Sequence, residues 1–131
     1  MRADELQQLL DTSPVHTALG LTVRLAGDEL VLDATPGREH SVDGGTFAHG
    51  GVIATILDAA ATFALIDATG ADWSTVDLRI DFVRPVPLAL LQVAGRVAQV
   101  GRRFGRAGAE LREPGAERLL ASAVGTFVRS E

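Results

Sequence analysis

The sequence predicts an α+β domain in which an antiparallel β-sheet wraps around one long central helix. Residues 50–69 form an almost unbroken apolar run, long enough for about five turns of helix and closed by Gly70. A helix that is apolar nearly all round must be covered on most of its faces. Two strand-like segments precede this run and four follow it, and these are the segments available to cover it.

The segments before the central helix are short and alternate in hydrophobicity. A helical pattern with Leu6, Leu9 and Leu10 on one face comes first. The expected elements are, in order, a helix over 4–10 ended by Ser13-Pro14, a strand over 19–25, a turn at Gly27-Asp28 and a strand over 29–34. Residues 35–48 then form a loop, and structureless loops of this length are often functional.

Four strand-like segments follow the central helix, and turn residues separate them. The segments are 74–83, 88–100, 104–112 and 118–129, with Pro85 and Pro87, Gly101, and Pro114-Gly115 between them. Long strands with regularly spaced turns favour an antiparallel meander. Because no linker or repeat divides the chain, we expect one domain over 1–131, with 1–17 as a short N-terminal helical segment.

The composition is that of an ordinary soluble globular domain, with 47% hydrophobic and 22% charged residues in a chain of 131. A net charge of -5 offers no basic surface for nucleic acid or an anionic membrane, so we expect neither partner. The N-terminus lacks the apolar core of a signal peptide. The apolar stretch 51–64 is interrupted by Asp58 and short for a bilayer span, and we expect a cytoplasmic protein.

Several kinds of chemistry are excluded by residue type. With no cysteine, the chain has no disulfide, catalytic thiolate or cysteine metal site. His16 and His40 show no metal-like spacing with other ligands. We therefore expect neither a metal nor a cofactor.

A His-Gly-Gly step, His49-Gly50-Gly51, opens the central helix and marks the candidate site. A helix N-terminus favours a developing negative charge, and glycine lets a ligand approach the backbone closely. Asp58 lies eight residues after Gly50 among apolar residues, where a carboxylate is costly without a partner or a task. The plainer alternatives are a tight turn for the glycines and a solvated helix position for Asp58.

The string Asp-Gly-Gly-Thr-Phe-Ala-His-Gly-Gly over 43–51, followed by Asp58-Ala59, resembles the hotdog-fold acyl-CoA thioesterases of the phenylacetate-pathway (PaaI-like) type. Strand 74–81 is a second match, in which Thr75 corresponds to a hydroxyl residue that the family carries near its site. The similarity extends from residue 19 to 128. It implies hydrolysis of an acyl-CoA or aryl-acyl-CoA thioester to free acid and CoA, at paired sites on the interface of a homodimer or homotetramer.

Thioester hydrolysis needs a donor for the carbonyl oxygen and a base or nucleophile near the carbonyl carbon. The Gly50 N–H fits the first role. Asp58, assisted by Thr75, fits the second, either by activating water or by forming a mixed anhydride. Eight residues of helix at roughly 1.5 Å each separate Gly50 from Asp58 by about 12 Å. One carbonyl group therefore contacts both only if they come from two subunits, with their helices antiparallel across a two-fold axis.

Asp43 departs from the family pattern, which commonly has Asn at this position. An ionised Asp accepts hydrogen bonds but cannot donate one. Asp43 is then protonated when it works, orients the attacking water, or acts as a second base, and we expect it to position water. If Asp43 and Asp58 share one site, their titrations couple and one pKa rises.

The remaining candidates are expected to bind substrate. His49 and Gly51 accompany Gly50, and we expect His49 to position groups rather than to act as a general base. Arg102 and Arg103, with Arg106, flank the Gly101 turn and are candidates for a clamp on the phosphates of CoA, the alternative being an ordinary solvated turn. Arg84 is a further candidate.

Two other functions fit the same features. A hotdog acyl-CoA hydratase or dehydratase would use a catalytic histidine, for which His49 is the candidate, so its replacement would abolish activity. A non-catalytic acyl-CoA-binding module would bind its ligand without turnover. A carrier-protein thioester is the open alternative to CoA.

Overall fold

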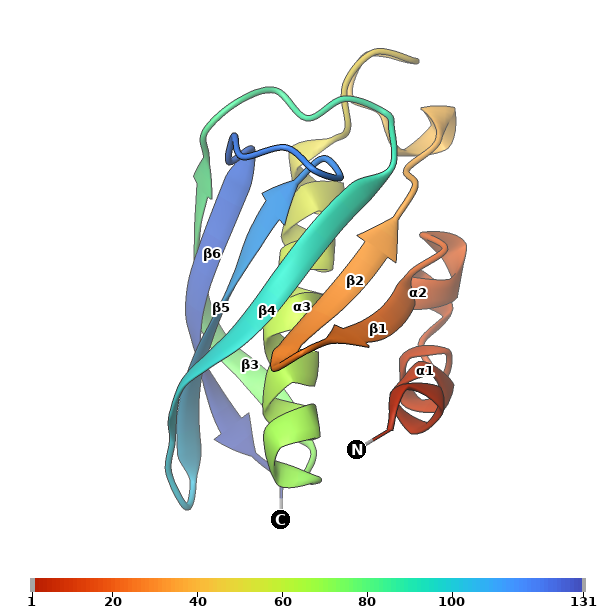
Figure 1. Ribbon diagram of the computed structural model, residues 1–131. Coiled ribbons are helices and arrows are strands. Elements are labelled where there is room, and N and C mark those ends of the chain that lie inside the picture. Colours follow the sequence, from red (N-terminus) through yellow and green to blue (C-terminus); the bar gives the residue numbers. More distant parts are fainter. Residues whose placement is uncertain (1, 131) are drawn as a thin grey trace.

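One curved antiparallel sheet holds a long helix against its inner face (Figure 1). The structure is a computed structural model and describes residues 2–130. In chain order its elements are α1 (Ala3–Leu10), α2 (Pro14–Ala18), β1 (Thr22–Ala26), β2 (Glu29–Ala34), the 3-10 turn η1 (Arg38–His40), α3 (Gly50–Thr69), β3 (Trp73–Phe82), β4 (Leu91–Val100), β5 (Phe104–Arg112) and β6 (Ala121–Arg129). The strand order across the sheet is β1-β2-β4-β5-β6-β3. The predicted α+β class, with a sheet around a central helix, is confirmed.

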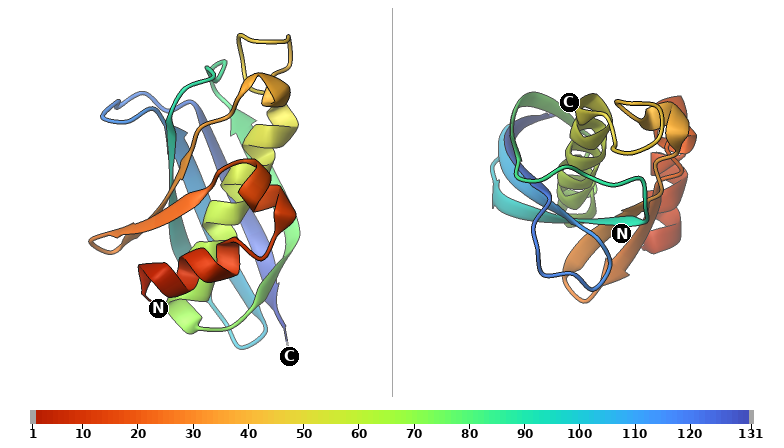
Figure 2. Two further views of the ribbon diagram at one scale, coloured as in Figure 1. Left: turned by 90° about the vertical axis from the view of Figure 1, so that its right-hand side faces the viewer. Right: turned by 90° about the horizontal axis from the view of Figure 1, so that it is seen from above.

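The central helix has the predicted limits. α3 begins at Gly50 after the cap residue His49 and ends at Gly70, whose φ of 71° places it in the left-handed conformation typical of a helix C-terminus. The sheet curves around α3 on one side, and α1 and α2 lie along the other (Figure 2). Phe63 of α3 meets His16 of α2 edge-on, with ring centroids 6.0 Å apart.

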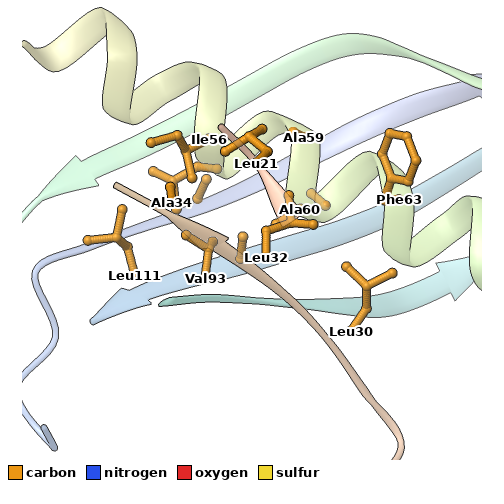
Figure 3. Close-up of a cluster of buried hydrophobic side chains, with 14 of the residues drawn as sticks. Leu21, Leu30, Leu32, Ala34, Ile56, Ala59, Ala60, Phe63, Val93 and Leu111 are labelled. Carbon is orange, nitrogen blue, oxygen red and sulfur yellow. The ribbon is translucent and has the colours of Figure 1, made fainter. Parts of the chain in front are cut away.

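The core lies between α3 and the strands and consists mostly of aliphatic side chains (Figure 3). The labelled side chains in Figure 3 come from α3 (Ile56, Ala59, Ala60, Phe63), from the residue before β1 (Leu21), from β2 (Leu30, Leu32, Ala34) and from β4 and β5 (Val93, Leu111). The helix approaches β4 closely at Gly95, where a Cβ atom would collide with the carbonyl of Ala60. Small residues at this crossing therefore set how deeply α3 sits in the sheet.

The predicted meander of all four later strands is only partly right. β4, β5 and β6 form a meander, but β3 pairs with β6 at the sheet edge and β4 pairs with β2. The connection from β3 to β4, which contains Pro85 and Pro87, passes over the end of the sheet (Figure 1). Proline cannot donate to a strand ladder, and β4 begins at Leu91 rather than at 88.

Other boundaries also differ from the expectation. β6 begins at Ala121 rather than at 118, and the loop 35–48 contains the short turn η1. Ser13-Pro14 does end the first helix, but it also begins α2, with Pro14 in the first turn. Proline is well suited to that position because its missing N–H would have no partner there.

The two edges of the sheet are treated differently. At the β1 edge, the Gln7 side chain of α1 donates to the Leu21 carbonyl (3.1 Å) and accepts from the Val23 N–H (2.7 Å). This side chain occupies backbone groups that an edge strand would otherwise leave open. At the β3 edge, no strand among residues 2–130 pairs with the outer side, and Val76 (56%) and Phe82 (55%) are more than half exposed.

α3, which extends beyond the stretch 51–64, is long and apolar enough to cross a membrane by length and composition alone. Of its apolar 18-residue window, 56% is buried inside the protein. The core helix of a soluble fold meets the same criteria, and α3 is the core helix of this sheet.

Candidate active site

The first turn of α3 presents a free backbone donor. The Nδ1 atom of His49 accepts a hydrogen bond from the Gly51 N–H (2.9 Å), which caps the helix. The Gly50 N–H has no acceptor among residues 2–130. It therefore combines an unsatisfied donor with the positive end of a helix of 20 residues, which suits an oxyanion.

The contacts of His49 select one tautomer of its neutral ring. Because Nδ1 accepts from a backbone N–H, the neutral ring carries its proton on Nε2. The backbone N–H of His49 donates to the His40 carbonyl (2.8 Å), which ties the helix start to the preceding loop. In this arrangement the basic nitrogen is occupied, and His49 organises the helix start.

Asp43 organises the loop before the helix. Its Oδ1 atom accepts hydrogen bonds from the backbone N–H groups of Thr46 (2.8 Å), Gly45 (3.3 Å) and Phe47 (3.3 Å). The Thr46 hydrogen bond above all lowers the pKa of Asp43 to about 2. Of the three roles left open for Asp43, the protonated donor is therefore disfavoured. A rise in the pKa of Asp43, one outcome of a shared site with Asp58, does not occur within one chain.

Asp58 meets Thr75 across the interface of α3 and β3. The Thr75 hydroxyl donates to Asp58 Oδ1 at 2.6 Å, so Oδ2 is left for another partner. Ile56, Leu57 and Ala59 are buried, whereas Asp58 is only partly buried. The premise that Asp58 is enclosed among apolar residues is thus wrong for a single chain, since it lies on the open side of α3.

A β-bulge that the sequence analysis missed aims Thr75 at the helix. The pairing of β3 with β6 skips Val76, with Thr75 opposite Phe127 and Asp77 opposite Thr126. Without the extra residue, strand alternation would place Thr75 on the face opposite Leu78 and Ile80, which pack against the core. Bulges of this kind redirect a side chain next to a functional site.

The predicted residues thus form two groups on one chain. Gly50, Gly51, His49 and the Asp43 loop gather at the start of α3, whereas Asp58 and Thr75 meet two turns further along. The rise of the helix, roughly 1.5 Å per residue, separates the groups by about 12 Å. The Gly50 N–H and the Asp58 carboxylate, which were expected to act on one carbonyl group, therefore lie in different groups.

Comparison with known proteins assigns the family. Residues 45–118 match the thioesterase superfamily. The chain belongs to this superfamily. It is 34% identical over 126 residues to an esterase-named protein of Pseudomonas aeruginosa, and the match covers 92% of each chain. This thioesterase is therefore a hydrolase that acts on thioesters.

Solved structures support the same fold. A thioesterase-type, phenylacetic acid degradation-related protein from Ralstonia eutropha JMP134 superposes with a TM-score of 0.78 at 27% identity, over 94% of this chain and 98% of that one. The E. coli PaaI protein gives a TM-score of 0.84 at 20% identity, over 100% and 97% of the chains, and shows the fold alone. The resemblance to PaaI-like hotdog thioesterases is confirmed.

The arginine candidates lie at opposite ends of the thioesterase. Arg84 lies at the Gly50 end, and its Nη1 donates to the Leu119 carbonyl (2.9 Å). Arg102 and Arg103 form the β4–β5 turn at the other end (Figure 1), beside a cavity of about 690 Å³. Arg129 lines the same cavity, and its guanidinium stacks over the Trp73 ring at 4.9 Å. Within residues 2–130, Arg102, Arg103 and Arg129 form no salt bridge.

A cleft of about 360 Å³ opens beside Gly50. Its lining includes Val42, Phe47, Ile53, Phe82, Val83 and Val86. Two ring atoms of Phe82 lie 3.7 Å from the position that a Cβ atom on Gly50 would take. In the part of the chain that the structure describes, no three His, Asp or Glu side chains gather as a metal site.

Proposed function

We propose that this thioesterase hydrolyses acyl-CoA thioesters at sites shared between two subunits of a homodimer. The observation that carries the proposal is the free Gly50 N–H on the same helix as the Asp58–Thr75 pair, two turns away. With two copies of α3 antiparallel across a two-fold axis, Gly50 of one subunit faces Asp58 of the other. Each pair of residues then completes one site.

The chemistry follows from the free positions on each group. The thioester carbonyl oxygen accepts from the Gly50 N–H, which stabilises the oxyanion that forms on attack. Asp58 of the other subunit, fixed through Oδ1 by Thr75, either takes the proton of a water that attacks the carbonyl carbon or attacks that carbon itself. The C–S bond then breaks, and CoA leaves as a thiolate that takes up a proton. In the second route, water hydrolyses the mixed anhydride.

The uncovered surfaces of the single chain support this assembly. α1 and Gln7 cover the β1 edge, but the β3 edge exposes Val76, Phe82 and Val83. Gly51, Thr55 and Asp58 form an incompletely buried stripe on α3. An unpaired edge strand with exposed apolar side chains, beside such a stripe, is the surface that a second copy would cover. A homotetramer would use further surfaces.

The supporting residues keep the roles that their contacts allow. His49 and Gly51 fix the helix start, so that the Gly50 N–H stays free. Asp43, whose carboxylate accepts hydrogen bonds from the loop N–H groups and from the Thr46 side chain, is the candidate that positions the attacking water. The hydrogen bond that Nδ1 of His49 accepts from the Gly51 N–H disfavours His49 as the base of a hydratase.

The arginines at the far end are the candidates that would hold the phosphates of CoA. Arg129 of β6 is paired with Trp73 of β3. Trp73 lies two residues before Thr75, which is about 7 Å along the strand at roughly 3.3 Å per residue. Arg103 adjoins Arg129, whose N–H donates to the Arg103 carbonyl (2.7 Å), so the subunit that supplies Asp58 and Thr75 is also the one that would supply Arg102 and Arg103. Guanidinium groups that form no salt bridge within residues 2–130 suit phosphate oxygens. Arg84, partly used by the Leu119 carbonyl, is the second cationic candidate.

The direct experiment measures thiol release from a panel of aliphatic and aryl acyl-CoA thioesters, with wild type and Asp58→Asn compared. We expect turnover by wild type and a loss of about a hundredfold or more in the variant. A His49 variant should be weakened but not inactive. Absence of turnover on every CoA thioester, with tight binding retained, would contradict the proposal and favour the binding module. Turnover of carrier-protein thioesters alone would contradict the choice of CoA.

A further inference from the structure

The cavity beside the β4–β5 turn is lined by three cationic side chains. Arg102 and Arg103 come from the turn itself, and Arg129 comes from the end of β6. The Arg129 N–H donates to the Arg103 carbonyl (2.7 Å), which holds the turn against the end of β6 (Figure 1). Because none of the three forms a salt bridge within residues 2–130, their like charges repel one another around the cavity, and an anion between them would relieve this repulsion.

Arg129 is the most firmly placed of the three arginines. Its guanidinium stacks over the Trp73 ring at 4.9 Å, and the Trp73 side chain is itself held by a hydrogen bond from its indole N–H to Thr69 Oγ1 (2.9 Å). The Nε atom of Arg129 is buried and has no hydrogen-bond acceptor within residues 2–130. A buried donor without an acceptor costs free energy, and an anion in the cavity would supply the missing acceptor.

A terminal phosphate group suits this arrangement better than a bridging phosphate or a carboxylate does. Near neutral pH a terminal phosphate carries a charge of about −1.5 to −2 and has three free oxygens. A bridging phosphate or a carboxylate has two free oxygens and a single charge. Because a guanidinium group binds phosphate oxygens in pairs, several arginines around one cavity can share the oxygens of one terminal phosphate.

We propose that this cavity binds a terminal phosphate group and that Arg129 is its central donor. The inference rests on the proposed function for the identity of the ligand. CoA carries a terminal phosphate on the 3′ position of its ribose, whereas the phosphopantetheine of a carrier protein has a bridging phosphate alone. Arg129 is then a specificity-determining residue that favours CoA thioesters over carrier-protein thioesters. A free phosphomonoester has the same chemistry, and the test distinguishes these two sources.

The test measures affinities by calorimetry with three probes: CoA, dephospho-CoA, which lacks the terminal phosphate, and inorganic phosphate. We expect wild type to bind CoA about tenfold or more tightly than dephospho-CoA, and Arg129→Gln to bind the two within about twofold of each other. The double variant Arg102→Gln/Arg103→Gln, which changes exposed turn residues and leaves the Trp73 stack intact, should also reduce the preference. Arg24→Gln on β1, which lies outside the cavity lining, should keep it.

The fluorescence of Trp73 locates the bound phosphate. Trp73 is the single tryptophan of the chain, and Arg129 stacks on its ring, so a phosphate at Arg129 should change its emission. Inorganic phosphate should shift the emission of wild type in a saturable way and leave that of the double variant unchanged. A shift of the same size in both proteins would contradict binding at this cavity.

The outcomes separate this inference from the proposed function. A preference for CoA that the cavity variants lose supports the inference, even if no CoA thioester is hydrolysed. Phosphate binding that the double variant loses, with equal affinities for CoA and dephospho-CoA, supports the site and identifies a free phosphomonoester as its ligand. A preference for CoA that the cavity variants keep, or neither preference nor phosphate binding in wild type, would overturn the inference even if wild type hydrolyses acyl-CoA. If Arg129→Gln does not fold, the double variant decides.

Discussion

At the residue scale, Gly50 matters for its N–H rather than for its lack of a side chain. It occupies the first helical position, where proline is well tolerated, and His49 before it has the extended conformation (φ -65°, ψ 140°) that precedes proline. Gly50→Pro should therefore keep the helix and remove the donor. We expect kcat to fall about 10²- to 10³-fold, as for other oxyanion donors.

Gly50→Ala is the matched control, because its Cβ would lie 3.7 Å from the Phe82 ring and its N–H would remain. Its kcat should stay within about tenfold of wild type in the same steady-state assay. Similar losses in the two variants would show that crowding, and not the donor, matters at this position.

Thr75 is expected to act through Asp58. Thr75→Val keeps the shape of the side chain but removes the hydroxyl that donates to Asp58 Oδ1 at 2.6 Å. Since a hydrogen bond to a charged group contributes about 1.5–3 kcal/mol, kcat should fall roughly 10- to 100-fold, with KM less affected. Thr75→Ser should recover most of the loss. If Ser and Val are equally impaired, the hydrogen bond is not the cause.

Asp43 makes its loop sensitive to acid. Its pKa is about 2 in the folded protein, below the ordinary value of 3.8, so the carboxylate stabilises the loop above pH 4. That stabilisation is lost as the pH falls through about 2. An NMR titration should show the Asp43 carboxyl and the Thr46 and Phe47 amides changing together with a midpoint near 2. A midpoint near 4 would contradict the hydrogen-bonded loop.

The activity of an Asp43 variant tests the separate proposal about water. Asp43→Asn keeps an oxygen acceptor for the loop but replaces the second carboxylate oxygen with an amide. We expect a measurable fall in kcat at neutral pH. Unchanged activity would contradict a water-positioning role.

At the element scale, β3 shows what local sequence patterns can and cannot predict. The strand itself followed from its β-favouring residues, and the likeness to a known family pointed to Thr75. The bulge at Val76 was missed, although a signal exists: the inward residues change from odd positions at Trp73 to even positions at Leu78 and Ile80. A strict alternation cannot place all three on one face without an extra residue.

The Asp77 side chain stabilises this bulge. Its Oδ1 accepts from the Thr126 N–H of β6 (3.1 Å), directly after the skipped residue. Asp77→Ala should lower the free energy of unfolding by about 1 kcal/mol and also lower kcat, because Thr75 loses its fixed direction. Asp77→Asn keeps the acceptor and is the control. Urea unfolding and kinetics on the same samples measure both effects, and a stability loss with unchanged kcat would show that the bulge does not position Thr75.

The helix was predicted to the residue, whereas the strand order was not. α3 is marked by its apolar run, His49-Gly50 at its start and Gly70 at its end, which are all local signals. The pairing of β3 with β6 instead of β4 depends on contacts between residues far apart in sequence, such as Phe82 and Ala121. Local periodicity holds no information about such pairs.

At the scale of the whole molecule, the sheet has one edge that is covered, at β1, and one that is uncovered, at β3. Gln7 covers the β1 edge with two hydrogen bonds, but β3 exposes apolar side chains next to the incompletely buried stripe of α3 (Gly51, Thr55 and Asp58). The spacing of Gly50 and Asp58 predicted separate half-sites, and the single chain indeed keeps them apart. The mutual position of two subunits is a prediction that rests on this spacing.

The most direct test mixes two inactive subunits. A heterodimer purified through two different tags would carry Asp58→Asn in one subunit and Gly50→Pro in the other. If sites are shared, one site joins the intact Gly50 to the intact Asp58, and the heterodimer should regain about half of the wild-type activity per dimer. If the heterodimer is as inactive as its two parents, Gly50 and Asp58 act within one chain and the account of a shared site is wrong.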